Sequence, residues 1–350
     1  MPSDETRRLL AELEAVTARL QDVEAALREQ AERRPRSAVR ARLRAWSSPR
    51  LGKLRQHAPE PLLVPTSYMC TDPPSPAPRI SIVTPSFQYG RFIERTIYSV
   101  LSQGYPNLEY VVQDGGSEDG TVEVLRRYEG ALAGWVSETD AGQGDALNRG
   151  FARTHGEIMA YLNSDDLLLP GSLAYVASYL QGHPEVDAVY GQRVLIDERD
   201  HQVGVWVVPP HDDEVLGIAD FVPQESLFWR RRAWERAGGR MDGTFDYALD
   251  WDLLLRLRDS GARIERLPRF LGAFRIHDRQ KTQAAGSDRD AEAERIRRRT
   301  QGRPMTGDEA YARTRAFLRR HVVHHTVARA AARLPRHRSE VRTLPPVGYG

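Results

Sequence analysis

Between residues 79 and 162 the chain alternates short apolar segments with longer segments of helical pattern. The apolar segments predict strands at 79–84, 108–113, 134–138 and 157–162. The segments between them predict helices at 91–103, 118–129 and 143–154. This alternation predicts an α/β fold whose mostly parallel sheet carries helices on both faces. Ligands in such folds bind beyond the carboxyl ends of the strands, so the residues there are the candidates for chemistry.

Acidic residues follow three of these four predicted strands. Asp114 follows the second strand, Asp140 the third, and Asp165 and Asp166 the fourth. Carboxylates gathered at one sheet edge repel each other unless a cation lies among them. Mn²⁺ or Mg²⁺ suits such a site, because substrate phosphates often complete its coordination. Each of these acidic segments, taken alone, also fits a turn or the N-cap of a helix.

Composition excludes several classes of protein. The chain has 350 residues, of which 40% are hydrophobic and 28% charged, as in soluble globular proteins. Cys70 is the only cysteine, which excludes an intrachain disulfide and a cysteine-based zinc cluster. No apolar run reaches the ~18 residues of a membrane span, and the first residues do not resemble a secretory signal. We therefore expect a cytoplasmic protein.

Charge is distributed unevenly and indicates four regions. Residues 79–282 carry a net charge of −9, whereas 31–60 carry +7 and 283–350 carry +8. An acidic centre argues against nucleic acid as a partner. We expect a basic, Pro-rich linker at 35–78, a catalytic domain at 79–282 and an Arg-rich helical extension at 283–350. The basic flanks are either solvated helix surface or a peripheral contact with the inner face of the cell membrane.

The first region, residues 1–34, has the pattern of an amphipathic helix. Apolar residues spaced 4, 3, 4, 3 and 4 apart form a coiled-coil-like seam at Leu9, Leu13, Val16, Leu20, Val23 and Leu27. The seam predicts either self-association through residues 9–27 or a single helix that packs on the rest of the chain.

Several motifs resemble those of the family 2 glycosyltransferases of the bacterial cell-surface polysaccharide type. They cover 79–282 in the family's order: Ser81-Ile82-Val83-Thr84-Pro85-Ser86, Gln113-Asp114-Gly115-Gly116-Ser117, Asp140-Ala141-Gly142-Gln143-Gly144, Asn163-Ser164-Asp165-Asp166, Asp250-Trp251-Asp252 and Arg275-Ile276-His277. The resemblance implies a GT-A fold, a Rossmann-like mixed sheet. It also implies a hexosyltransferase-type enzyme that uses a nucleotide-diphosphate sugar and a glycan or lipid-linked acceptor.

The resemblance also implies roles for single residues. It makes Asp250 the catalytic base, ahead of Asp246 and Asp252, and assigns the metal to Asp166 and His277. Asp114 would bind the nucleotide base, and Asp165 would lie near the ribose. The complete set expected to bind the nucleotide-sugar is Thr84, Pro85, Ser86, Asp114, Asp140, Gln143, Asn148 and Asp165. The candidates for the acceptor side are Gln224, Glu225 and Trp229.

One departure from the family pattern affects the metal site. Asn163 stands where many relatives have the first Asp of an Asp-x-Asp motif, so it adds no charge, and the metal is assigned to Asp166 instead. The expected reaction inverts the anomeric carbon, with a metal that stabilises the departing diphosphate. Two alternatives are a catalytically inactive sugar-nucleotide-binding module and a sugar-1-phosphate nucleotidyltransferase. The second usually has a Gly-rich, basic loop after its first strand, which this sequence lacks.

Overall fold

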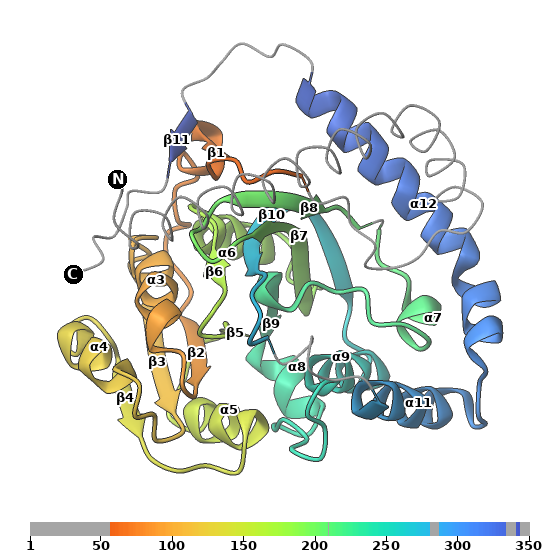
Figure 1. Cartoon of the computed structure of the whole chain (residues 1–350), viewed down its shortest axis with the longest axis horizontal. Coiled ribbons are helices and arrows are strands. Elements are labelled where there is room, and N and C mark those ends of the chain that lie inside the picture. Colours follow the sequence, from red (N-terminus) through yellow and green to blue (C-terminus); the bar gives the residue numbers. More distant parts are fainter. Residues whose placement is uncertain (1–56, 209, 281–286, 334–340, 344–350) are drawn as a thin grey trace, which may run out of the picture. The chain divides into compact units, whose positions relative to one another are not determined.

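The computed structural model describes residues 57–208, 210–280, 287–333 and 341–343. The seam at 9–27 and most of the basic segment 31–60 lie outside these residues. The described residues form a mixed α/β fold around a nine-stranded sheet (Figure 1). Within them no helix is long and apolar enough to cross a membrane.

The sheet has the order β4-β3-β2-β5-β9-β7-β10-β6, with β8 paired to β7. Its strands are β2 Ile80–Ser86, β3 Leu108–Asp114, β4 Gly134–Ser137, β5 Ile158–Tyr161, β6 Leu167–Leu168, β7 Ala188–Ile196, β8 Gln202–Trp206, β9 Leu227–Arg230 and β10 Ile264–Arg275. The half from β4 to β5 is parallel, as the sequence predicted. The strand β9 is antiparallel to both of its neighbours and joins this half to the parallel pair β7 and β10.

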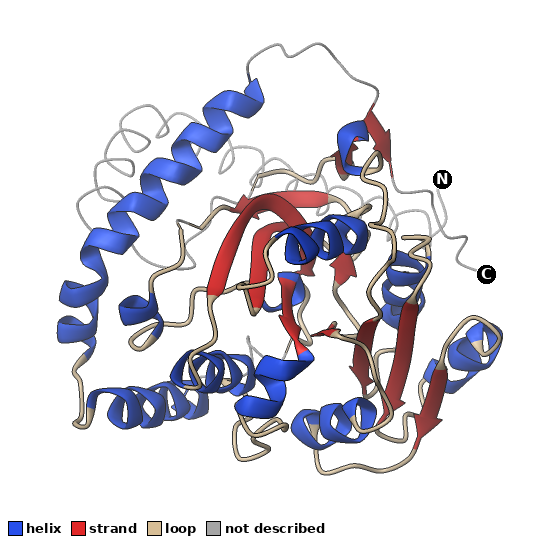
Figure 2. Ribbon diagram, turned by 180° about the vertical axis from the view of Figure 1, so that it is seen from behind, coloured by secondary structure: helices blue, strands red, loops and turns tan. Residues whose placement is uncertain are grey.

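Two sets of helices cover the two faces of the sheet (Figure 2). One set consists of α3 Gly90–Leu101, α4 Thr121–Tyr128 and α6 Ser172–Gly182. The other consists of α5 Gln143–Phe151, α8 Arg231–Arg236 and α9 Leu249–Asp259. Alternation along β2 divides the core, because Ile80 and Ile82 pack against the first set while Val83 packs against the second. The fold class predicted from the sequence is therefore confirmed.

The remaining elements frame this body. Between β8 and β9 lie α7 Asp213–Leu216 and the 3₁₀ turn η2 Gln224–Ser226. After β10 come α11 Ser287–Gln301 and α12 Gly307–Arg333, the helices of the Arg-rich extension. Ile296 of α11 and Phe317 of α12 are buried in the same core cluster as α9. The pair β1 Leu63–Pro65 and β11 Val341–Thr343, together with the 3₁₀ turn η1 Thr66–Tyr68, lies outside the main sheet.

Candidate active site

A cavity of about 640 Å³ opens beyond the carboxyl ends of β2 and β5. The strand order reverses at this point, because β3 pairs with one side of β2 and β5 with the other. Such a reversal is where ligands bind in open α/β sheets. Half of the residues predicted for the site line the cavity, namely Pro85, Ser86, Asp140, Gln143, Asp165, Gln224 and Asp250.

The cavity wall at the end of β2 carries a hydroxyl group that is free to bind a polar ligand. The hydroxyl of Ser86 is buried and has no hydrogen-bond partner among the described residues. A buried hydroxyl without a partner costs free energy that a ligand could recover. Gly115 also lines this part of the cavity, and its N–H donates to the Ser86 carbonyl at 2.8 Å.

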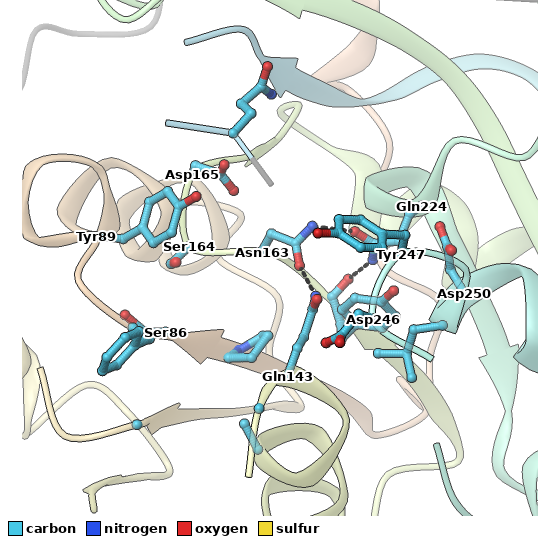
Figure 3. Close-up of a pocket in the computed structure, with 18 of the residues that line it drawn as sticks. Ser86, Tyr89, Gln143, Asn163, Ser164, Asp165, Gln224, Asp246, Tyr247 and Asp250 are labelled. Carbon is cyan, nitrogen blue, oxygen red and sulfur yellow. Dashed lines mark hydrogen bonds between the residues drawn. The ribbon is translucent and has the colours of Figure 1, made fainter. Parts of the chain in front are cut away.

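Asp165 and His277 form a pair at one side of the cavity (Figure 3 labels Asp165). His277 Nε2 lies 3.0 Å from Asp165 Oδ2, and its ring packs against Phe92. Arg275 fixes the turn that carries Asp165, because its side chain donates to the Asp165 carbonyl. Two side chains of the motif Arg275-Ile276-His277, those of Arg275 and His277, thus hydrogen-bond to Asp165 in this turn. His277 itself is behind Asp165 and does not line the cavity.

Asp166 occupies a different position from the one predicted for a metal ligand. Its side chain points into the protein, 1% of the residue is exposed, and Oδ1 accepts a hydrogen bond from the backbone N–H of Arg275. Burial, with Asp165 as the next contribution, raises the pKa of Asp166 well above its usual range. Both residues were predicted to lie at the site. Asp165 does face the cavity, whereas Asp166 is buried and stabilises the fold.

A chain of amide side chains crosses the floor of the cavity (Figure 3). Gln143 Nε2 donates to Asn163 Oδ1 at 2.8 Å, and Asn163 Nδ2 donates to Gln224 Oε1 at 3.1 Å. Gln224 Nε2 then donates to the Tyr161 carbonyl at 2.8 Å. Every link has a fixed direction, since a carbonyl can only accept. Asn163 is therefore the centre of a network that the sequence did not reveal.

Asp250 lies at the far side of this floor from Asp165 (Figure 3). It is in the first turn of α9, and Oδ1 accepts from the N–H of Trp251. Burial raises the pKa of Asp250 to about 6, with Glu225 adding to the rise and Arg193 opposing it. The rival Asp252 is fully buried and pairs with Arg256 and Arg299, which excludes it from the cavity wall.

Asp220 is a cavity residue that the sequence analysis did not single out. Burial, with the Asp250 carboxylate as the next contribution, raises its pKa well above the usual range. It lies in the connection between α7 and η2, a segment without a recognisable motif. Only the fold brings it near Asp250.

The three acceptor candidates have different positions. Gln224 lines the cavity, whereas Glu225 is buried behind it in a two-bond ion pair with Arg193. Arg193 lies against the rings of Trp206 and Phe274, and all three line the cavity. Trp229 does not: it is fully buried and packs between Phe151 and Trp234. The prediction that Trp229 lies on the acceptor side is wrong, because its side chain on β9 points into the core.

Three residues predicted to bind the nucleotide-sugar instead form hydrogen bonds that stabilise the segments around the cavity. The Asp114 carboxylate is fully buried and accepts from Ser117 and Ser137, including their hydroxyls at 2.6 Å. The Thr84 hydroxyl is paired with the Tyr110 hydroxyl. Asn148 makes two hydrogen bonds with the backbone of Met241. None of the three lines the cavity.

Comparison with known proteins assigns the family. The profile described as Glycosyl transferase family 2 matches residues 81–233. An uncharacterized glycosyltransferase of Mycobacterium tuberculosis is 32% identical over 186 residues, which are 51% of this chain and 69% of that relative. This chain belongs to glycosyltransferase family 2. The O-antigen biosynthesis protein RfbC of Myxococcus xanthus is 29% identical to this glycosyltransferase over 192 residues. The aligned residues are 53% of this chain and 15% of RfbC.

The fold of this glycosyltransferase is shared with a solved structure. Residues 1–349 of Staphylococcus aureus TarS, in complex with UDP-GlcNAc, superpose with a TM-score of 0.54 at 16% identity. The match covers 73% of this chain and 76% of that one. At this identity the likeness concerns the GT-A type of fold.

Proposed function

We propose that this family 2 glycosyltransferase moves a sugar from a nucleotide-diphosphate sugar to an acceptor hydroxyl, with inversion at the anomeric carbon. One observation carries the proposal: Asp165 and Asp250 face one cavity from its two sides, with a floor of neutral amides between them. A leaving diphosphate and an attacking hydroxyl need opposite sides of the sugar. The arrangement provides one carboxylate for each.

A divalent ion, Mn²⁺ or Mg²⁺, would be held beside the diphosphate by Asp165, which lines the cavity, with His277 as a second candidate ligand directly behind it. A carboxylate oxygen next to an imidazole nitrogen is a donor set that suits such an ion. No group of three or more His, Cys, Asp or Glu side chains suited to a metal occurs in the described residues, so phosphate oxygens and water would complete the coordination. When bound, the ion would stabilise negative charge on the departing diphosphate.

The metal assignment has a consequence for His277. The N–H of Arg279 donates to Nδ1 at 3.2 Å, so in the neutral ring Nε2 carries the proton and donates to Asp165. His277 would hold a metal through Nε2 only in the tautomer that carries its proton on Nδ1. Asp165 would therefore be the primary ligand and His277 the second.

The chain's own residues supply orientation and proton transfer. Ser86 would bind the nucleotide with its unpaired hydroxyl, and Gln143, Asn163 and Gln224 would meet the sugar hydroxyls with their remaining N–H groups and lone pairs. Asp250 would take the proton of the acceptor hydroxyl as it attacks. A carboxylate whose pKa is about 6 is ionised at neutral pH and is more basic than an ordinary aspartate.

The acceptor side would lie around Arg193, Trp206 and Phe274, which line the same cavity as Asp250 and Asp220. Aromatic rings and a guanidinium suit the faces and hydroxyls of a sugar. Because one relative is an O-antigen biosynthesis protein, we propose a glycan or lipid-linked acceptor in cell-surface polysaccharide synthesis.

The test measures nucleoside diphosphate release from a panel of nucleotide-sugars with Mn²⁺, with and without sugar acceptors. Asp250→Asn is expected to lower kcat by ~10²- to 10⁴-fold while leaving donor binding intact. Asp259→Asn, an exposed aspartate on the same helix, is the matched control and should retain full activity. Equal turnover by Asp250→Asn and the wild type would refute the assignment of the base.

A further inference from the structure

A glutamate of the C-terminal extension holds the backbone that carries the proposed catalytic base. Glu292 Oε1 accepts from the N–H of Asp246 at 2.7 Å, and Oε2 accepts from the N–H groups of Tyr247 and Ala248 at 2.8 and 2.9 Å. These three amides directly precede α9, where N–H groups have no partner within the helix. One carboxylate therefore satisfies three successive donors at the start of the helix that carries Asp250.

The contact is one of four along a single face of α11. Arg295 packs on the ring of Phe245 and donates to Thr244, and Arg299 pairs with Asp252. Ile296 is buried in the same core cluster as Leu249 and Trp251. Positions 292, 295, 296 and 299 have the spacing i, i+3, i+4 and i+7, so one face of the helix contacts residues 244–252 throughout (Figure 1).

The segment held in this way is part of the active-site wall. Asp246, Tyr247, Leu249 and Asp250 all line the cavity. The family profile ends at residue 233, so neither this segment nor α11 is covered by it. The extension thus supplies a support that the matched part of the chain lacks.

We propose that Glu292 is a positioning residue for Asp250: its carboxylate fixes the backbone of 246–248 and thereby the place of the base. This inference rests on the proposed role of Asp250. Negative charge at the start of a helix is favourable, and a carboxylate accepts all three bonds. A glutamine cannot, because its NH₂ group would face at least one of the N–H donors.

The test compares Glu292→Gln with Glu294→Gln in the full chain. Glu294 is an exposed glutamate on the same helix that pairs with Arg298, which makes it the matched control. We expect Glu292→Gln to lower kcat by ~10- to 100-fold, since a small misplacement of a reacting group is that costly, with a change in donor KM below about threefold. Glu294→Gln should leave both unchanged. An unchanged kcat in Glu292→Gln, with Asp250→Asn impaired, would overturn the inference.

A double variant separates positioning from general destabilisation. If Glu292 acts through Asp250, Glu292→Gln has no further effect on kcat in the Asp250→Asn background. The same loss in both backgrounds would show that Glu292 acts elsewhere and would refute the proposal.

Hydrogen exchange decides the contact itself without any substrate. Amides 246–248 should exchange faster in Glu292→Gln and not in Glu294→Gln. Unchanged exchange would refute the proposal whatever the kinetics. If instead Asp250→Asn has normal kcat, the assignment of the base fails, and the exchange result still reports whether Glu292 holds the segment.

Discussion

At the residue scale, neighbouring aspartates of this site have different tasks because their surroundings differ. Asp165 faces the cavity beside His277, whereas Asp166 is turned inward onto the N–H of Arg275. The Asn-Ser-Asp-Asp segment could not be resolved from sequence, because both carboxylates follow the same strand and only the turn geometry decides which one faces outward. Arg275, which fixes that turn, lies more than a hundred residues later.

The pH dependence of the reaction reports on Asp250. Burial raises its pKa to about 6, and a general base must be deprotonated to act. Activity is therefore full above this pKa and is lost as the pH falls through it, by ~10-fold per pH unit. The measurement is kcat/KM between pH 5 and 8 in buffers of constant ionic strength. A kcat/KM that stays constant down to pH 5, as an ordinary aspartate that titrates near pH 4 would give, would contradict the assignment.

An aspartate at position 163, as in the Asp-x-Asp motif that the resemblance implied, should destabilise the fold. An aspartate there cannot donate to Gln224 Oε1, and a reversed Gln224 amide would turn its oxygen toward the Tyr161 carbonyl. Leaving one buried acceptor unpaired costs ~1–3 kcal/mol, so Asn163→Asp should lower the free energy of unfolding by about that amount. Urea denaturation without ligands measures it. A variant as stable as the wild type would show that the amide chain is not needed.

At the scale of elements, the sequence predicted the parallel half of the sheet closely. Predicted helix 91–103 corresponds to α3, and predicted strand 108–113 to β3. Apolar residues recur every 2 residues in strands and every 3.6 residues in helices. These patterns involve only residues close in sequence, so they can be recognised from the sequence alone. The antiparallel strand β9 was not predicted, and with it the burial of Trp229 was missed. The face on which a strand's side chains lie depends on its neighbours, which are distant in sequence.

The contact between α5 and β2 gives a prediction about packing. A Cβ at Gly150 would overlap the Cγ1 atom of Val83, so α5 must move away from the sheet. Gly150→Ala is therefore expected to lower the free energy of unfolding by ~1–3 kcal/mol despite the better helix propensity of alanine. Gly182→Ala, at the end of α6, is the matched control because its Cβ meets nothing within 4 Å. Equal stability of the two variants in urea would contradict this account of the packing.

At the scale of the whole molecule, the Arg-rich extension supports the cavity wall without lining the cavity, because Glu292 binds the backbone of residues 246–248. The sequence separated 283–350 from the catalytic region because its composition changes there. In the structure Ile296 and Phe317 of this extension belong to the same buried cluster as α9. The apolar stripe of the extension that includes Phe317 predicted either packing on the catalytic region or contact with a membrane surface, and the structure shows that Phe317 packs in the core. The apolar face of α11 was not predicted, because composition reports solvent-facing residues most strongly.

Ligand binding should stabilise the entire described fold, and the metal should contribute through Asp165. A ligand at one hundred times its Kd stabilises by ~2.7 kcal/mol, which for a chain of this size raises Tm by roughly 4 °C. We expect a nucleotide-sugar with Mn²⁺ to raise Tm more than the nucleotide-sugar alone, and EDTA to remove the difference. Asp165→Asn should lose this metal-dependent part.

Asp166→Asn is the decisive comparison. Burial raises the pKa of the Asp166 carboxyl well above its usual range, which disfavours the charged form, and the carbonyl oxygen of an asparagine can still accept from the N–H of Arg275. This variant should therefore keep the whole metal-dependent rise in Tm that Asp165→Asn loses. The reverse result, with the rise lost in Asp166→Asn and kept in Asp165→Asn, would return the metal to the residue that the sequence alone had selected.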